Sequence, residues 1–416
     1  MFTNHTFWKI LSNCLLLFAL LPAGCLAQPA PDQVAVPSPS SLEYETVPPL
    51  LQTVTPSASA LVLTASPSPT TEVTVMSFPV PDAIPVDIYV KPASEDMLAF
   101  ESAGSGWTTY IPAEWYELSQ QGKNVEVPSI SSIAVSDDGS IWFGSMGGPV
   151  SMGTGAYRFD GKDWTHYTVW EGLPANEISA LLVAPDGAIW FSTFSRGVSR
   201  YDGRSWTAYR SVNGLASDDV RSMAVAADGA LWFGTSQSGA SRFDGVNWET
   251  FTAENGLSAN FVGHISTLPD GSLLFSVSDG RRAYLDRFDG ENWSSFPTEW
   301  TERGKYTEQL LLSPDGGLWF LTETDGLYRL DGDRWTHFAN GDGPAGEWLS
   351  SGTVASDGGV WIAGVQGVSR FDGSHWTNFT NDDGLVSNWI NAVVEGSDGS
   401  IWVGGAGGIS RYQALR

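Results

Sequence analysis

A variable position recurs seven times in the chain, just before a short apolar run, and its occupants have side chains suited to binding chemistry. With the copies aligned on a shared Asp-Gly pair, the position holds Ser129, Glu177, Asp219, Phe261, Tyr306, Trp348 and Trp389. The preceding position adds Asn176, Asp218, Asn260, Lys305, Glu347 and Asn388. Aromatic rings beside carboxylates and amides suit the face of a sugar or another ligand with apolar and polar parts. The residues that we predict to bind a ligand are Glu177, Asp219, Phe261, Tyr306, Trp348, Trp389, Asn176, Asn260 and Asn388.

The aromatic residues have a second interpretation that stays open. The tryptophans outside the repeated signatures and the N-terminal segment fall in expected loops, and they are Trp115, Trp170, Trp300, Trp348 and Trp389. Such rings also pack loops onto the neighbouring strands, and this role needs no ligand.

One histidine occupies a place where catalysis is conceivable. Of the five histidines, only His264 lies on an expected inner strand; the others are His5, His166, His337 and His375. We include His264 among the predicted ligand-binding residues, and the alternative is a metal-dependent lyase or hydrolase that uses it with Glu177 or Asp219. A lone histidine on an inner strand more often packs or lines a channel. The other polar residues expected to face the central channel are Ser132, Ser222, Gln309 and Ser351.

Other catalytic patterns are missing from the sequence. The expected globular part has no cysteine, no Gly-x-Ser-x-Gly, no phosphate-binding loop and no histidine-rich metal spacing. The acidic pairs at 137–138 and 382–383 lack the alternating oxygen ligands of a calcium loop, so we interpret them as turn residues. We predict no catalytic residue, no metal and no cofactor.

The elements that must position these side chains repeat with a period of a little over forty residues. Residues 178–209 show one unit: four short runs rich in β-branched and aromatic residues, separated by turns that include two Asp-Gly pairs. Short runs of this kind favour strands, and Asp-Gly between them favours tight hairpins. Each unit is therefore predicted to be a four-stranded antiparallel sheet, which must pack its two apolar faces against neighbours.

The number of copies predicts a closed ring. Asp-Gly-x-x-Trp occurs in seven units, with Leu274 replacing tryptophan in one, whereas Arg-aromatic-Asp-Gly-x-x-Trp occurs in only six, with Leu330 replacing the aromatic residue in one. The last unit stops after its third strand, and an isolated strand at 105–110 precedes the first unit. We predict an all-β fold, a seven-bladed β-propeller whose N-terminal strand pairs with Arg411 and Tyr412.

Composition and the N-terminal sequence indicate an exported protein. The formal net charge of −26 argues against nucleic-acid binding. Residues 1–25 have the apolar core of an export signal, and Ala23-Gly24-Cys25 resembles the lipobox of bacterial lipoproteins, which implies lipidation of Cys25; cleavage after Ala27 is the alternative. Residues 26–96 are rich in Pro, Ser and Thr and are predicted to be a disordered stalk. The propeller is predicted over 97–416, with repeats at about 126–412.

Two stretches carry a family resemblance. Residues 213–235 and 383–405 share Gly-Leu, a following apolar run and Asp-Gly-x-hydrophobic-Trp, and they resemble two-component regulator propeller repeats. That resemblance implies an extracytoplasmic, ligand-sensing propeller. A looser similarity is to streptogramin lyases, whose propellers use a His and Glu cluster with a divalent metal; this sequence offers no matching cluster.

These observations predict a non-catalytic, extracytoplasmic lipoprotein that binds on the loop face of its propeller. The predicted partner is a small molecule, a glycan or an envelope protein, with membrane attachment through the lipid and no nucleic acid. Two alternatives are a metal-dependent lyase or hydrolase of the streptogramin-lyase kind, and a scaffold for an envelope complex or a partner sensor kinase.

Overall fold

The computed structural model describes residues 88–94, 97–102, 104–120, 128–147, 153–296, 307–338 and 343–414. All of them belong to one compact unit, Thr70–Arg416. The predicted export signal, Cys25 and Tyr306 lie outside the described residues.

The described strands form seven antiparallel sheets. Blade 1 comprises β4 (Ser129–Val135), β5 (Ile141–Met146), β6 (Ala156–Phe159) and β7 (Trp164–Tyr167). Blade 2 comprises β8 (Ile178–Val183), β9 (Ile189–Thr193), β10 (Val198–Tyr201) and β11 (Trp206–Tyr209). Blade 3 comprises β12 (Val220–Val225), β13 (Leu231–Thr235), β14 (Ala240–Phe243) and β15 (Trp248–Phe251).

The next three blades repeat this order. Blade 4 comprises β16 (Phe261–Thr267), β17 (Leu273–Ser278), β18 (Ala283–Phe288) and β19 (Trp293–Ser295). Blade 5 comprises β20 (Thr307–Leu312), β21 (Leu318–Thr322), β22 (Leu327–Asp331) and β23 (Arg334–Phe338). Blade 6 comprises β24 (Leu349–Val354), β25 (Val360–Gly364), β26 (Gly367–Phe371) and β27 (Trp376–Phe379).

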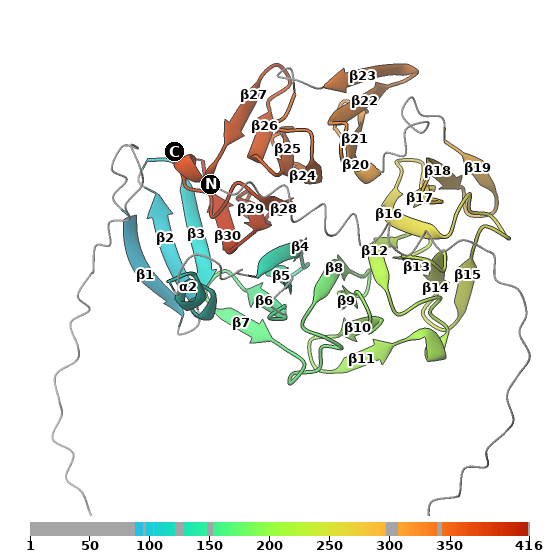
Figure 1. Cartoon of the computed structure of the whole chain (residues 1–416), viewed down its shortest axis with the longest axis horizontal. Coiled ribbons are helices and arrows are strands. Elements are labelled where there is room, and N and C mark those ends of the chain that lie inside the picture. Colours follow the sequence, from blue (N-terminus) through green and yellow to red (C-terminus); the bar gives the residue numbers. More distant parts are fainter. Residues whose placement is uncertain are drawn as a thin grey trace, which may run out of the picture. The chain divides into compact units, whose positions relative to one another are not determined.

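The inner strands of these sheets surround one axis (Figure 1). Each contacts the inner strand of the next blade, and the series returns from β28 of blade 7 to β4 of blade 1. The predicted all-β, seven-bladed propeller is therefore confirmed.

Blade 7 joins the two ends of the described chain. It comprises β28 (Ile390–Glu395), β29 (Ile401–Gly405), β30 (Gly408–Tyr412) and β3 (Trp107–Pro112). Trp107 pairs with Tyr412 and Thr108 with Arg411, which confirms the predicted closure, although the strand lies two residues beyond the expected 105–110.

Two strands extend this sheet outward and correct one sequence expectation. β2 (Met97–Ser102) pairs with β3, and β1 (Ile88–Ser94) pairs with β2, giving a six-stranded sheet. Residues 88–94 fall within the range expected to be a disordered stalk, so regular structure begins before residue 97.

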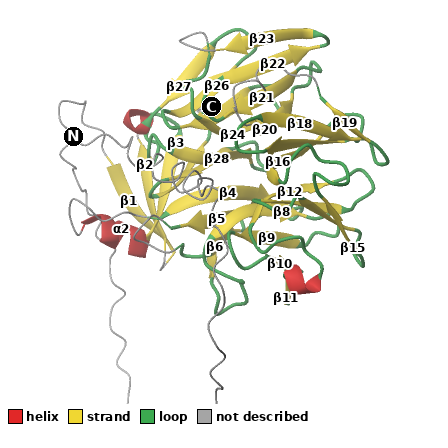
Figure 2. Ribbon diagram, turned by 45° about the vertical axis from the view of Figure 1, so that its right-hand side comes forward, coloured by secondary structure: helices red, strands yellow, loops and turns green. Residues whose placement is uncertain are grey.

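Helices are few, and Figure 2 shows them as short red segments among yellow strands. Within the described residues they are α2 (Ala113–Gln120) and the 3-10 helices η1 (Ser211–Asn213) and η3 (Asn381–Asp383). The composition did not predict α2. Its Trp115 is buried and meets the Tyr157 ring of β6 edge-on at 6.0 Å between centroids, so this tryptophan packs the helix onto blade 1. No helix in the described part is long and apolar enough to cross a membrane.

The repeated signature residues hold the blades together. The first-signature tryptophans are buried against the next blade: the Trp190 ring stacks on Tyr209 at 5.3 Å and reaches Phe233 of blade 3 at 5.5 Å. The Asp of each first signature forms an ion pair with the Arg of its blade. The pairs are Arg158–Asp138, Arg200–Asp186, Arg242–Asp228, Arg287–Asp270, Arg329–Asp315, Arg370–Asp357 and Arg411–Asp398.

Candidate functional site

Every inner strand contains a bulge near its start. In each blade the pairing of the inner strand with the second strand skips one residue. The skipped residues, which we call the bulge ring, are Ser131, Ser179, Arg221, Gly263, Glu308, Ser350 and Asn391. Because a bulge redirects a side chain out of the pleat, these residues occupy equivalent places around the axis.

Four members of the bulge ring tie each blade to the next. A hydroxyl or amide donates to a main-chain carbonyl in the first two residues of the next inner strand. The pairs are Ser131 Oγ to Ile178 O at 2.6 Å, Ser179 Oγ to Val220 O at 2.7 Å, Ser350 Oγ to Ile390 O at 2.7 Å and Asn391 Nδ2 to Ile130 O at 2.8 Å. These side chains have a structural role.

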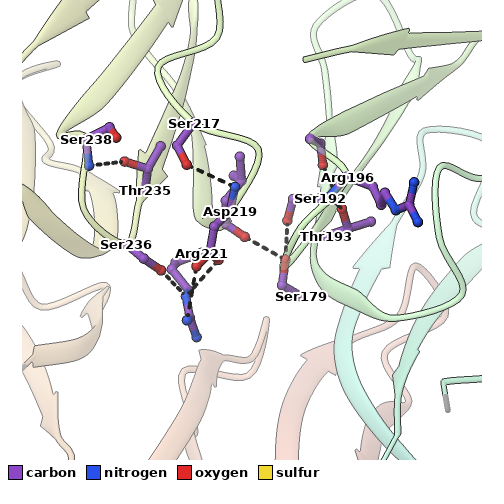
Figure 3. Close-up of polar contacts among 12 residues, drawn as sticks. Ser179, Ser192, Thr193, Arg196, Ser217, Asp219, Arg221, Thr235, Ser236 and Ser238 are labelled. Atoms are coloured by element: carbon purple, nitrogen blue, oxygen red, sulfur yellow. Dashed lines mark hydrogen bonds and ion pairs between the residues drawn. The ribbon is translucent and has the colours of Figure 1, made fainter. Parts of the chain in front are cut away.

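Blades 3, 4 and 5 depart from that rule in succession, starting with Arg221. Its Nε lies 2.5 Å from Ser236 Oγ and 3.2 Å from Asp219 Oδ1 (Figure 3). The guanidinium also lies over the Phe194 ring of blade 2, 4.7 Å from its centroid. Arg221 is thus held in place by an ion pair, a hydroxyl and a ring, and none of these contacts ties its blade to blade 4.

In blade 4 the bulge residue is Gly263, which has no side chain. A Cβ at this position would lie 3.0 Å from Cε1 of Phe261, so glycine allows that ring to approach the strand closely. The space that a serine would fill in other blades is therefore bordered by the half-buried Phe261.

In blade 5 the bulge residue is Glu308. Burial raises the pKa of its carboxyl to about 7, and the nearby Glu323 adds to this rise, while Arg221 opposes it. Burial also raises the pKa of Glu323. The Glu308 residue as a whole is half-buried, while the surrounding protein removes most of the hydration of its carboxyl. Within the described residues neither glutamate forms a hydrogen bond or an ion pair.

His264 follows the bulge of blade 4. Burial lowers the pKa of its imidazole to about 4, so the ring is neutral at pH 7. Among the described residues, no group of three or more His, Cys, Asp and Glu side chains is arranged to hold a metal ion.

The described residues predicted to bind at the variable position lie at the starts of the inner strands. Phe261 begins β16, whereas Glu177, Asp219, Trp348 and Trp389 directly precede their strands. Glu177 is exposed, Asp219 is paired with Arg221, and Phe261, Trp348 and Trp389 are half-buried. Ser129, which was not predicted to bind, accepts a hydrogen bond from Asn391 Nδ2 at 2.7 Å.

Four residues at the position before the variable one, the three predicted asparagines and Asp218, brace their own loops. In each case the side-chain oxygen accepts the N–H of the residue seven positions earlier. The contacts are Val169 N to Asn176 at 2.9 Å, Ser211 N to Asp218 at 2.6 Å, Ala253 N to Asn260 at 2.8 Å and Asn381 N to Asn388 at 2.7 Å. The structure therefore gives Asn176, Asn260 and Asn388 a role in fixing the loop ends.

Residues expected to face the channel also join neighbouring blades. Ser132, Gln309 and Ser351 accept the N–H groups of Leu181 at 3.0 Å, Gly352 at 2.7 Å and Val393 at 3.2 Å respectively. These side chains lie along the wall between blades, each engaged with a main-chain donor.

Sequence reasoning missed Arg221, Glu308, Glu323 and Phe194. The signal that identifies the first two is the comparison of the seven copies two residues after the variable position: four copies carry Ser or Asn, and three successive copies carry Arg, Gly and Glu. Glu323 and Phe194 lie in the loops after the second strands of their blades, where the copies differ in length and are harder to align.

Three segments match the model of the two component regulator propeller family: residues 172–195, 214–237 and 384–407. Each segment runs from the loop before an inner strand to the end of the second strand, so it includes the variable position and the bulge. The chain is a seven-bladed β-propeller that carries repeats of this kind. No curated protein matches it in a sequence comparison.

Solved propellers share this fold. The extracellular domain of a hybrid two-component system from B. thetaiotaomicron aligns with a TM-score of 0.56 and 18% identity, over 69% of this chain and 40% of that chain. Virginiamycin B lyase from Staphylococcus aureus, crystallised with quinupristin, aligns with a TM-score of 0.55 and 14% identity, over 69% of this chain and 96% of that one. YCF48 bound to a D1 peptide aligns with a TM-score of 0.52 and 16% identity, over 70% and 95%.

These likenesses concern the fold alone. The chain spans about two fifths of the length of the similar two-component extracellular domain. The candidate site described above rests on the contacts of this chain, and the identity is too low to transfer a binding site residue by residue.

Proposed function

We propose that the protein is an extracytoplasmic, sensor-type β-propeller that binds a ligand at the mouth of the channel on its loop face. The observation that carries this proposal is the break in the bulge ring at blades 3 to 5. Four blades use this position to tie neighbours together, whereas three successive blades use it for Arg221, Gly263 and Glu308. A change confined to one side of a repeating ring fits a single binding site better than a packing role.

The repeats and the N-terminal sequence support the extracytoplasmic location. Three segments match the two component regulator propeller model, and a propeller of similar fold is the extracellular domain of a two-component system. The export-signal pattern in residues 1–25 agrees with this location. The ligand is a small molecule or a glycan, or a segment of an envelope protein.

A thermal-shift screen of the whole chain tests this function. Glycans, cell-wall fragments, small metabolites and divalent metals are added in turn. A ligand at a hundred times its dissociation constant should raise the free energy of unfolding by about 2.7 kcal/mol. We expect the Trp348→Ala/Trp389→Ala variant to lose this stabilisation, because both rings precede inner strands at the mouth.

The control is Val246→Ala, since Val246 is 82% exposed at a third-to-fourth-strand hairpin. It should keep the full shift. A shift that survives in the double tryptophan variant would place binding away from these two rings. A response to metal alone would support the lyase alternative, and a response to no compound would support a scaffold.

We further propose that the protein is anchored through a lipid on Cys25. Ala23-Gly24-Cys25 carries this proposal. Expressed with its N-terminal segment in a bacterium fed an alkyne fatty acid, the protein should become labelled and enter the membrane fraction, and Cys25→Ser should do neither. Equal labelling of the two proteins would contradict the anchor.

A further inference from the structure

Opposite charges lie on the two sides of Gly263 in the bulge ring, where the missing side chain leaves a gap. Arg221 of blade 3 and Glu308 of blade 5 occupy equivalent positions on either side of blade 4, where Gly263 contributes no side chain. Their charges interact, because Arg221 affects the titration of Glu308. In the described part of the chain, however, they form no ion pair within 4.0 Å. The two charges therefore flank the same blade from equivalent positions without neutralising each other directly.

Arg221, on the positive side of the gap, is fixed in a position suited to binding an anionic group. Arg221 uses Nε and Nη2 for Ser236 and Asp219, and Phe194 supports one face of the guanidinium. Its Nη1 makes no hydrogen bond within the described residues. A fixed guanidinium with a free donor suits a carboxylate, because binding then costs little side-chain entropy.

In the part of the chain that the structure describes, no cation forms an ion pair with Glu308 or Glu323 on the negative side. Glu308 and Glu323 repel each other in a place with little water, and neither has a hydrogen-bond donor in the described part of the chain. An ammonium group between them would supply donors and relieve the repulsion. The Phe194 and Phe261 rings border the same region and suit an apolar segment between the two charged groups.

We propose that this gap binds an amino-acid-like zwitterion, with its carboxylate at Arg221 and its ammonium at Glu308 and Glu323. The inference rests on the proposed ligand-binding function and names the chemical class of its ligand. Blade 5 lacks one hydrogen bond to the next blade, because Glu308 makes no contact like that of Ser350, whose hydroxyl donates to Ile390 O of the next blade. Such a loss of stability at one position is typical of a functional site.

The first test is calorimetric titration of the whole chain with matched probes. L-phenylalanine, L-leucine and L-glutamine are compared with their C-terminal amides and with their N-acetyl derivatives. We expect at least one free amino acid to bind, and its amide and N-acetyl forms to bind at least tenfold more weakly. Equal binding of a blocked form, or no binding by any of the three free amino acids, overturns the proposal.

The second test identifies the residues. Arg221→Gln and Glu308→Gln should each weaken binding at least tenfold, whereas Glu347→Gln, a change at an exposed residue before Trp348, should leave it unchanged. Glu308→Ser should remove binding and raise the melting temperature, because a serine here can tie blade 5 to blade 6. Tight binding by either glutamine variant contradicts the assignment even if both variants fold normally.

Proton release supplies a readout that a structural role would not change. The charged groups near Glu308 are Glu323 and Arg221, and His264 of the adjacent strand stays neutral. An ammonium lowers the pKa of Glu308, so binding near pH 7 should release about half a proton, measured from titrations in buffers of different ionisation enthalpy. Glu308→Gln should release none. If the thermal screen finds a ligand that needs Trp348 and Trp389 but is no zwitterion, this inference fails and the proposed function stands.

Discussion

Trp107→Ala is expected to lower the free energy of unfolding by about 3–5 kcal/mol, the cost of removing a large buried aromatic side chain. Trp107 is 1% exposed and begins the strand that completes blade 7. Its ring lies 5.1 Å from that of Tyr412 in the same sheet and 5.6 Å from that of Phe379 in blade 6. The substitution therefore weakens the closure of the ring as well as the contact between its last two blades.

Urea unfolding followed by far-ultraviolet circular dichroism measures this effect. Trp170→Ala is the matched control, because Trp170 is 91% exposed and its loss should change the free energy of unfolding by less than about 0.5 kcal/mol. If the two variants were equally stable, β3 would not be part of the cooperative fold. A first transition limited to blade 7 would show that closure and the remaining blades unfold separately.

The fold could be predicted because its determinants are local and repeated. Asp-Gly pairs, short apolar runs and buried tryptophans recur in phase, so errors in one copy are corrected by the others. The closure could be predicted by counting strands, because the last unit lacks a fourth strand and an isolated strand precedes the first unit. Strands β1 and β2 and helix α2 escaped prediction because each occurs once and lies outside the repeat, where single-copy propensity is weak.

The candidate site was predicted only in part, and the bulges are one reason. A one-residue bulge reverses the side-chain alternation of a strand, and a strand of six residues is too short for sequence periodicity to reveal it. Ser132, Gln309 and Ser351 were thus expected to face the channel, while Arg221 and Glu308 were overlooked. The structure shows that Ser131, Ser179 and Glu308 all occupy the bulge, so that each side chain leaves the regular alternation of its strand.

The amide residues illustrate a second limit. An asparagine that binds a ligand and one that closes a loop look alike in sequence. The structure distinguishes them through a regular contact, in which the side-chain oxygen of Asn176, Asn260 or Asn388 accepts the N–H seven residues earlier. The constant spacing in separate blades is typical of a structural role.

The seven Arg–Asp pairs predict a loss of stability in acid. The pKa of every one of the seven aspartates is lowered in the folded protein. For Asp315 the hydrogen bond from Ser313 is the largest cause, and Arg329 contributes, so that its pKa falls to about 2. A depressed folded-state pKa stabilises the protein above the unfolded value of about 3.9 and loses this effect as pH falls towards 2.

The free energy of unfolding should therefore decrease by about 2–7 kcal/mol between pH 4 and pH 2, taking about 0.3–1 kcal/mol for each exposed pair. Glu308 gives the opposite slope at higher pH: its raised pKa destabilises the fold as pH rises from 4.5 to about 7, so stability should be greatest near pH 5. Urea unfolding at intervals of half a pH unit measures both slopes. Arg329→Met should flatten the acid slope, whereas Lys162→Met should not, because the ion pair of Lys162 within the described residues is with its exposed neighbour Asp163. An acid slope that is identical in wild type and Arg329→Met would show that these ion pairs do not control acid unfolding.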